Sequence, residues 1–468
     1  MKQFYITLIL ALYCFCAKAS ILNQDISNKM HNLTWDGIDV LQFSTNLNDW
    51  IDIRNAENTH ASPIIAPNQF YRLRQADYSL HSNYSNNNDV ALIDYDKNLI
   101  HIWSNAYPLG TSAYLQDDGS IIKSGRLNDS PFIAGGVGGN IEKLSWDSSL
   151  IWNFTYSSSN FCLHHDIEVL PNGNILAIAW ELLDQQSALN FGRDPALLST
   201  NDNNVVWSES IIELEPDGTN APSIVWRWNA HDHLIQDYDS TKLNYGIISE
   251  NPNLINFNYP ESDDPDWLHL NGIDYNADLD QIVLSSRTFS EIWIIDHSTT
   301  IEEAATSQGG NSGMGGNILY RYGNPQAYDR GTASDQKLGG QHNPTWIPKN
   351  YDGAGNLLIF NNGLHRGYSS VDEITPPLTN EYKYFIEDGQ SFGPNDLEWT
   401  YDGNTTNTFY AAFVCGTQRL HNGNTLITIG PTRRYFEVTH DGDIVWDHIE
   451  PGNGIIFKVE RYFFDIPN

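Results

Sequence analysis

The sequence predicts an all-β protein, a six-bladed β-propeller preceded by a small N-terminal β module. Three observations predict it. The 468 residues are 40% hydrophobic and 12% aromatic, which is typical of a chain with a sizeable core and not of a disordered one. A short segment that ends on a large aromatic residue recurs six times after residue 90. Gly/Asn-rich turns between apolar runs follow most of these segments, and such turns are the strongest local signal of a β-hairpin.

The first 19 residues are predicted to be an export signal. A charged start at Lys2 leads into an apolar run from Phe4 to Phe15, and Ala17-Lys18-Ala19 supplies a small-x-small cleavage pattern. The run is shorter than the roughly 20 helical residues that span a bilayer. We therefore expect a periplasmic or secreted protein without membrane insertion.

Residues 20–78 predict a small β module or N-terminal cap. Two β-like runs, around residues 39–53 and 68–75, lie on either side of a stretch rich in Pro, Ala and Asn, and neither run shows a helical period. The following segment, 79–89, reads SLHSNYSNNND and is polar throughout. This composition is typical of a linker.

Residues 90–468 are predicted to form the propeller. The recurring aromatic segments end at or near Trp103, Trp152, Trp226, Tyr320, Trp399 and Trp446. The hairpin turns lie near Gly119, Gly173, Asp278, Gly355 and Gly423. Six units of short strands fit four-stranded blades better than the alternative, a decorated β-sandwich. The strand-like run GIIFKVERYFF near the end indicates that the closing blade takes one strand from the other terminus.

The charge balance argues against nucleic-acid and polybasic membrane roles. The chain has 58 Asp and Glu against 25 Lys and Arg, a formal charge of −33, so its surface repels phosphate backbones and anionic lipids. Beyond the export signal only Cys162 and Cys415 remain, and one disulfide or two buried thiols are equally open. Neither has a second Cys at zinc-binding spacing, so no structural metal is expected.

Several histidines stand at equivalent positions of different blades. The innermost strands of a propeller face its axis, so residues one blade apart in sequence converge on one central funnel. His165 lies in HHDIEVLPNGN, His269 in DWLHLNGIDYN and His342 in GGQHNPTWIP. Arg287 follows His269 by 18 residues, where the strand after the hairpin returns to the same end.

These motifs, with YRYGNPQAYDRGT and QRLHNGNTLIT, together resemble the bacterial arylsulfate sulfotransferases, exported enzymes that move sulfuryl groups between phenols. The resemblance covers about Asp94 to the C-terminus. It implies a six-bladed propeller and a ping-pong transfer through a sulfohistidine, with no nucleotide donor, no metal and no other cofactor. Its implied partners are a small aryl sulfate donor and a phenolic acceptor.

The resemblance also implies the roles of single residues. His342 would be the nucleophile, His269, Asn271 and Arg287 would hold the sulfate oxygens, and His165, or its neighbour His164, would complete the cluster. The chemistry of sulfuryl transfer by itself also calls for these residue types. Sulfate oxygens need a guanidinium and N–H donors, and a departing phenol, with a pKa of about 10, needs a proton that a histidine can give.

Two rival functions use the same funnel. A non-catalytic propeller would bind sulfated or phenolic ligands, or glycans, without turnover. An aryl sulfatase-like hydrolase would pass the sulfuryl group to water in place of a phenol. The sequence leaves the oligomeric state, the natural donor and the natural acceptor open.

Overall fold

The computed structural model describes six short strands between residues 23 and 74, and then residues 77–83, 89–104, 107–128, 130–403 and 409–463. The predicted export signal lies outside these residues. The chain divides into two compact units: one of residues 1–78, 94–96 and 462–468, and a larger one of residues 79–93 and 97–461. No helix within the described part is both long enough and apolar enough to cross a membrane.

The smaller unit holds two three-stranded antiparallel sheets. The first consists of β1 (Asn23–Ser27), β2 (Met30–Thr34) and β5 (Thr59–Pro63), and the second of β3 (Val40–Ser44), β4 (Ile51–Asp52) and β6 (Phe70–Arg74). The two β-like runs of the sequence correspond to the second sheet. The strands of the first sheet are rich in Asn, His, Asp and Ser, so they lack the alternation that reveals a strand.

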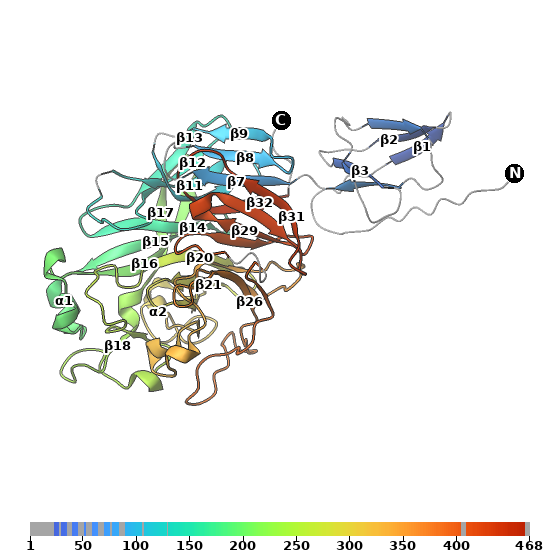
Figure 1. Ribbon diagram of the computed structural model, residues 1–468. Coiled ribbons are helices and arrows are strands. Elements are labelled where there is room, and N and C mark those ends of the chain that lie inside the picture. Colours follow the sequence, from blue (N-terminus) through green and yellow to red (C-terminus); the bar gives the residue numbers. More distant parts are fainter. Residues whose placement is uncertain are drawn as a thin grey trace. The chain divides into compact units, whose positions relative to one another are not determined.

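The larger unit is a six-bladed β-propeller, as the sequence predicted (Figure 1). Each blade is a four-stranded sheet, and the strands of blades 1 to 5 pair antiparallel. Blade 1 consists of β10 (Leu109–Leu115), β11 (Ile121–Arg126), β12 (Gly139–Leu144) and β13 (Leu150–Thr155). Blade 2 consists of β14 (Phe161–Val169), β15 (Ile175–Leu183), β16 (Val206–Asp217) and β17 (Asn220–Asn229). Blade 3 consists of β20 (Leu270–Asn276), β21 (Gln281–Ser286), β22 (Glu291–Asp296) and β23 (Tyr320–Tyr322).

The remaining blades complete the ring. Blade 4 consists of β24 (His342–Trp346), β25 (Leu357–Asn361), β26 (Ser370–Ile374) and β27 (Trp399–Tyr401). Blade 5 consists of β28 (Gly416–Arg419), β29 (Thr425–Ile429), β30 (Arg434–Val438) and β31 (Ile444–Ile449). Blade 6 joins β32 (Ile456–Tyr462) to β7 (Tyr78–Asn83), β8 (Val90–Asp94) and β9 (Leu99–Trp103). The last strand of the chain thus closes the ring beside the first strands of the propeller, as expected.

The repeated sequence elements occupy equivalent places in the blades. The recurring aromatic residues all lie on the fourth strand of a blade and are buried, at Trp103, Trp152, Trp226, Tyr320, Trp399 and Trp446. The Gly/Asn turns connect the two innermost strands in blades 1 to 5. The first strands β14, β20 and β24 contact one another in order, and they bring side chains of different blades to one axis.

Strand β7 lies in the segment that the sequence predicted to be a linker. Tyr78, Ser79, Leu80 and His81 are all buried, because β7 is an inner strand of blade 6 with neighbours on both sides. The Ser and His at these positions hid the strand from a reading based on apolar alternation.

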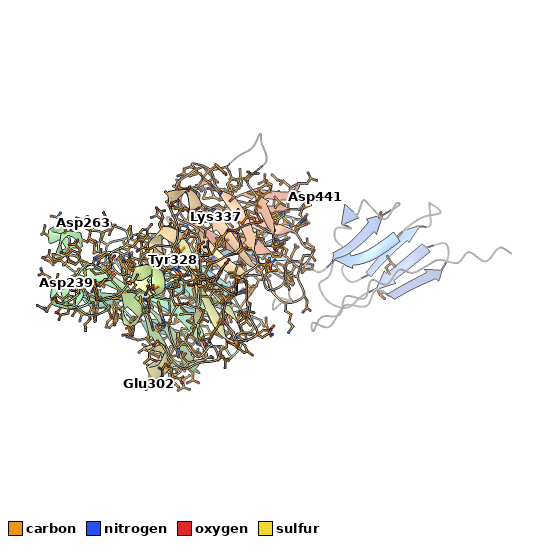
Figure 2. All side chains as sticks on the ribbon, turned by 90° about the horizontal axis from the view of Figure 1, so that it is seen from below. Asp239, Asp263, Glu302, Tyr328, Lys337 and Asp441 are labelled. Carbon is orange, nitrogen blue, oxygen red and sulfur yellow. The ribbon has the colours of Figure 1, made fainter. Side chains whose placement is uncertain are left out.

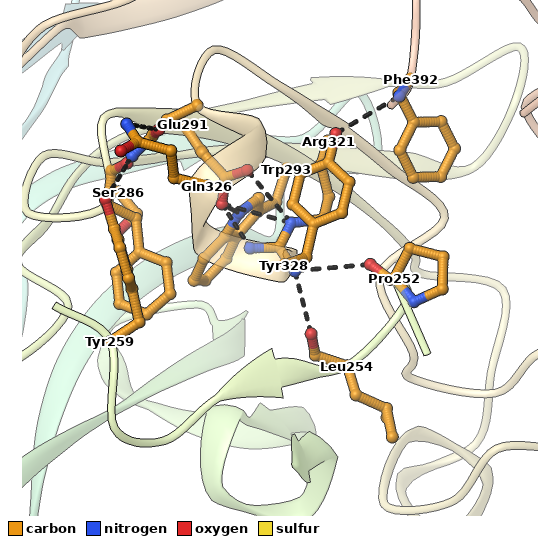
Figure 3. A network of polar contacts seen from close by, with 12 residues as sticks. Pro252, Leu254, Tyr259, Ser286, Glu291, Trp293, Arg321, Gln326, Tyr328 and Phe392 are labelled. Carbon is orange, nitrogen blue, oxygen red and sulfur yellow. Dashed lines mark hydrogen bonds and ion pairs between the residues drawn. The ribbon is translucent and has the colours of Figure 1, made fainter. Parts of the chain in front are cut away.

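Long insertions between blades 2 and 3 and between β22 and β23 are held by buried polar contacts. Arg321 on β23 is fully buried, pairs with Glu291 on β22 at 2.5 Å, and donates to the carbonyls of Leu254 and Pro252 (Figure 3). This fixes the insertion after β17 to blade 3. The insertion after β17 contains the parallel pair β18 (Leu234–Ile235) and β19 (Ile255–Asn256) and 3-10 turns at Ala230–His233 and Ile248–Glu250, and the insertion after β22 contains α2 (Ile301–Ala304). The other short helices lie in loops elsewhere: α1 (Gln185–Asn190), Pro195–Leu197 and Thr200–Asp202 between β15 and β16, Pro325–Tyr328 and Ala333–Asp335 between β23 and β24, and Gly430–Thr432 between β29 and β30.

Acidic side chains are exposed on the surface of the propeller. The exposed acidic residues Asp263, Glu302 and Asp441 lie at the margin of the propeller in the view of Figure 2.

Of the two alternatives for the cysteines, the structure has two free buried thiols, Cys162 and Cys415.

Candidate active site

The structure brings four predicted site residues together at the innermost strands. His165 lies on β14, His269 directly before β20, and His342 begins β24. The rings of His165 and His269 are 4.5 Å apart between centroids. The backbone N–H of Arg287 donates to the backbone carbonyl of His269 at 3.2 Å. His269, His342 and Arg287 all act electrostatically on His165. Three imidazoles and a guanidinium from blades 2, 3 and 4 therefore share one site.

Local backbone distortions aim these side chains. His165 and His269 have φ values of 50° and 48°, and Asn343, next to His342, has 47°. Each of these residues lies at or beside a register shift in the pairing of the first two strands of its blade. Left-handed backbone at a β-bulge is uncommon for residues other than glycine and re-aims a side chain out of the regular alternation. A left-handed residue at a register shift thus occurs in three consecutive blades, 2, 3 and 4.

The hydrogen bonds of His342 fix its tautomer. Its Nδ1 lies 2.8 Å from Oδ1 of Asn362 and 3.1 Å from the Gly340 carbonyl. The Asn362 amide is itself oriented, because its Nδ2 donates to the carbonyls of Ala411 and Val414. Both neighbours of Nδ1 are acceptors, so Nδ1 carries the proton. Nε2 accepts from the Val414 N–H at 3.1 Å and keeps its lone pair.

The surroundings of His342 keep it neutral. Burial, against the effect of the Asn362 hydrogen bond and with a contribution from the positive charge of Arg287, lowers its pKa to about 3. The ring of Phe457 on β32 lies 6.5 Å from the rings of both His342 and His165. A neutral imidazole whose unprotonated Nε2 lies beside an apolar ring is a competent nucleophile once the Val414 N–H gives way to the substrate.

Arg287 supplies positive charge, and His269 is held by a carboxylate. Nδ1 of His269 lies 2.5 Å from Oδ2 of Asp266, whose other oxygen accepts from Trp180 at 2.9 Å. Among the described residues no partner contacts Nε2 of His269, and none bonds the Arg287 guanidinium. Burial lowers the pKa of Arg287, which still remains a cation. These unoccupied donors suit an anionic ligand.

The two adjacent histidines of blade 2 have different surroundings. His165 faces His269, whereas His164 stacks on Trp180 with 3.9 Å between centroids and places Nε2 2.7 Å from Glu209. Their Nδ1 atoms are 2.8 Å apart. Of the pair that the sequence left open, His165 is therefore the one that faces the cluster.

The comparisons with known proteins bear on this geometry. The family model of arylsulfotransferase (ASST) matches residues 149–459, which contain all the site residues described above. The chain belongs to the arylsulfotransferase family. No curated protein matches the chain.

Several solved structures match this arylsulfotransferase family member at low identity. A protein of unknown function from Bacteroides caccae is 12% identical, with 82% of this chain and 98% of that chain covered and a TM-score of 0.45. AztD from Citrobacter koseri is 11% identical, with 83% of this chain and 98% of that chain covered and a TM-score of 0.36. Virginiamycin B lyase from Staphylococcus aureus, at 10%, covers 78% of each chain with a TM-score of 0.37. Likenesses of this size carry no argument about fold or function.

Asn271 has surroundings that the sequence did not predict for it. It is fully buried, and its Nδ2 donates to the backbone carbonyl of Gln341 at 2.9 Å. The amide thereby supports the residue before His342, and one of its two N–H groups is already used. Its Oδ1 is buried without a partner. No cluster of three or more metal-ligating side chains occurs in the described part of this arylsulfotransferase.

Sequence reasoning missed the residues that hold the predicted ones. Asp266 stands three positions before His269 in the motif DWLHLNGIDYN, so the sequence spacing itself suggests that the two side chains lie close together. Glu209, Asn362, Val414 and Phe457 come from other strands and loops, and no local pattern marks them. Only the ring of blades brings them to the histidines.

Proposed function

We propose that this arylsulfotransferase transfers a sulfuryl group from an aryl sulfate to a phenol in two steps, through a sulfohistidine at His342. The observation that carries the proposal is the tautomer of His342. Its Nδ1–H is held by Asn362 and Gly340, and its neutral Nε2 keeps a lone pair. The donor sulfur would replace the Val414 N–H as the partner of Nε2. The N–S bond forms as the S–O bond to the aryl group breaks.

Three neighbouring groups support the binding of the sulfate. The Arg287 guanidinium can bind two sulfate oxygens side by side, and His269 and His165 can donate from Nε2. Asp266 accepts from Nδ1–H of His269, so a doubly protonated His269 can donate from Nε2 to the sulfate. Phe413, an exposed residue next to Val414, offers apolar surface for the aryl ring.

The second step reverses the first with a different phenol. The acceptor oxygen attacks the sulfur of the sulfohistidine, the N–S bond breaks, and the phenol proton returns to a histidine of the cluster. No nucleotide donor and no obligatory metal take part in this scheme. We further propose that residues 1–19 direct export to the periplasm or the medium.

The decisive experiment is a mass measurement on protein quenched after mixing with 4-nitrophenyl sulfate. We expect the mass to increase by one sulfuryl group, located at His342 by peptide analysis at alkaline pH. H342N should show no such addition and should lose transfer by at least about 10³-fold. H440N, a substitution of an exposed histidine in blade 5, is the matched control and should behave as wild type.

The same assay separates the rival functions. A wild-type protein that binds the donor without releasing phenol would be a binding propeller and would contradict the proposal. Excess acceptor phenol should accelerate donor consumption if the sulfuryl group passes to phenols. Consumption that ignores added phenol would indicate hydrolysis by water.

A further inference from the structure

A hydrogen-bonded chain runs from the interior of blade 2 to the site. Oε2 of Glu209 on β16 lies 2.7 Å from Nε2 of His164, and Nδ1 of His164 lies 2.8 Å from Nδ1 of His165. Glu209 is 0% exposed, His164 3% and His165 5%. The chain therefore connects a carboxyl without solvent access to an imidazole that faces the reacting groups.

The chain has two proton arrangements. With Glu209 ionised, His164 donates from Nε2, so its Nδ1 accepts a proton from His165 and Nε2 of His165 holds a lone pair. With Glu209 protonated, it donates to His164, His164 donates from Nδ1 to His165, and His165 presents Nε2–H. Only one proton can lie between the two facing Nδ1 atoms, so the two ends of the chain change together.

We propose that Glu209 and His164 are a proton relay that lets His165 protonate the departing phenol oxygen and later accept a proton from the acceptor phenol. This inference rests on the proposed function of the site. Glu209 and His164 touch no reacting atom, so they are positioning residues that act through His165.

The relay balances in both half-reactions. As the S–O bond breaks, Nε2 of His165 gives its proton to the phenolate oxygen. His165 then takes a proton at Nδ1 from His164, and His164 takes one at Nε2 from Glu209, which becomes a carboxylate. When the acceptor phenol attacks the sulfohistidine, its proton enters at Nε2 of His165, and the three transfers run backwards. No proton is exchanged with solvent over the full cycle.

The surroundings favour this route over a simple imidazolium acid at His165. Burial lowers the pKa of His165 well below its ordinary value, and the positive charge of Arg287 adds to the effect. His165 is therefore neutral and can give up a proton only if it receives another at Nδ1. Burial, with the nearby charge of Asp266, raises the pKa of Glu209 well above its ordinary value, so the carboxyl starts with a proton to give.

A hydrogen bond and a ring stack hold the side chains of the relay in place. The other oxygen of Glu209 accepts from the Leu270 N–H at 3.0 Å, which ties the carboxyl to the strand that follows His269. The His164 ring lies within 6° of parallel to the Trp180 ring. Neither ring nor carboxyl needs to move for the protons to shift.

The test compares two donors in E209Q. A glutamine amide can donate to His164 and preserve the arrangement in which His165 presents Nε2–H, but it has no proton to release. With phenyl sulfate, whose phenol has a pKa of about 10, we expect the burst of phenol release to slow by about 10²-fold. With 4-nitrophenyl sulfate, whose leaving group needs little protonation, we expect a change below about threefold.

The matched control is E213Q, which replaces another buried carboxyl on the same strand that pairs with His297 away from the site. It should affect both donors equally. Equal rates of wild type and E209Q with both donors, or equal losses with both, would overturn the relay. The proposed function would fail differently, because wild type would then show no burst and no labelled His342.

A second measurement does not depend on the folding of a variant. In wild type, the burst with phenyl sulfate in mixtures of H₂O and D₂O should slow with a curved dependence on deuterium fraction, because several protons move together. A linear dependence, or no isotope effect, would show that at most one proton moves and would contradict the relay.

Discussion

At the scale of single residues, the hydrogen bonds of His342 decide which of its nitrogens can react. Asn362 binds Nδ1–H, and burial keeps the ring neutral with a pKa of about 3. An ordinary histidine becomes protonated below a pH of about 6.5 and loses its lone pair. The site has removed this constraint on its nucleophile by excluding water and by placing cations nearby.

This state of His342 predicts the acid side of the pH profile. As pH falls from 7 to 5, the folded protein should keep the His342 lone pair, because its pKa is far below this window. We expect the burst rate with 4-nitrophenyl sulfate at saturation to show no loss over this range in stopped-flow measurements. An acid limb with an apparent pKa near 6.5 would contradict a neutral, buried nucleophile.

The partner of His342 is a second target. N362L removes one of the two acceptors of Nδ1–H and takes the amide donor from the carbonyls of Ala411 and Val414. We expect transfer to fall by about 10- to 100-fold and stability to fall by about 1–3 kcal/mol, read from denaturant unfolding.

Asn361 provides the control for that substitution. It is equally buried, and its Nδ2 donates to Lys337 and Asp372 rather than toward His342. N361L should lower stability by a similar amount while the folded protein keeps its transfer rate. A loss of activity in N361L as large as in N362L would mean that the effect is general to the core of blade 4.

At the scale of elements, the first strands of blades 2, 3 and 4 carry the histidines of the site, and a tight approach by the loop between β11 and β12 of blade 1 keeps His165 in place. Gly136 has a φ of 76°, and a Cβ at this position would lie 2.3 Å from Nε2 of His165. G136A should therefore displace the imidazole from the cluster. We expect transfer to fall by more than about tenfold, measured as the burst rate with either donor.

Backbone strain alone can be separated from this collision. Gly173 has a φ of 88°, but a Cβ there would meet nothing within 4 Å. G173A introduces the same left-handed strain of about 1–2 kcal/mol without a contact. It should lower the melting temperature and leave the burst rate unchanged. Equal activity losses in the two variants would show that strain, and not the position of His165, is responsible.

The sequence predicted the strands that carry the histidines, because the turns and the outer aromatic residues repeat and leave the inner strands as what lies between them. It did not predict the left-handed residues at His165 and His269, since nothing in a non-glycine residue marks a bulge. Nor did it predict the surroundings of Asn271. Its contact with Gln341 depends on the register between blades 3 and 4, which sequence spacing leaves undetermined.

At the scale of the whole molecule, the last strand closes the ring with a charged contact. Lys458 on β32 pairs with Asp166 on β14 at 2.9 Å and also donates to the Tyr114 hydroxyl on β10. Glu460 on β32 and Asp274 on β20 lie in the same electrostatic cluster. Residues distant in sequence thus meet around one axis with more carboxyl groups than cations.

This excess predicts how stability depends on pH. Burial raises the pKa of Glu460 to about 7 and that of Asp274 to about 6. Between about pH 4.5 and 7 the folded protein therefore binds more protons than the unfolded chain, so these groups lower stability as pH rises. E460Q removes one of these charges and should flatten the decline by about 1–2 kcal/mol, discounted because Glu460 is partly exposed. Urea unfolding at pH 5 and pH 8 measures it, with exposed Glu398→Gln as the control. A decline that E460Q leaves as steep as in wild type would show that Glu460 is already ionised in the folded ring.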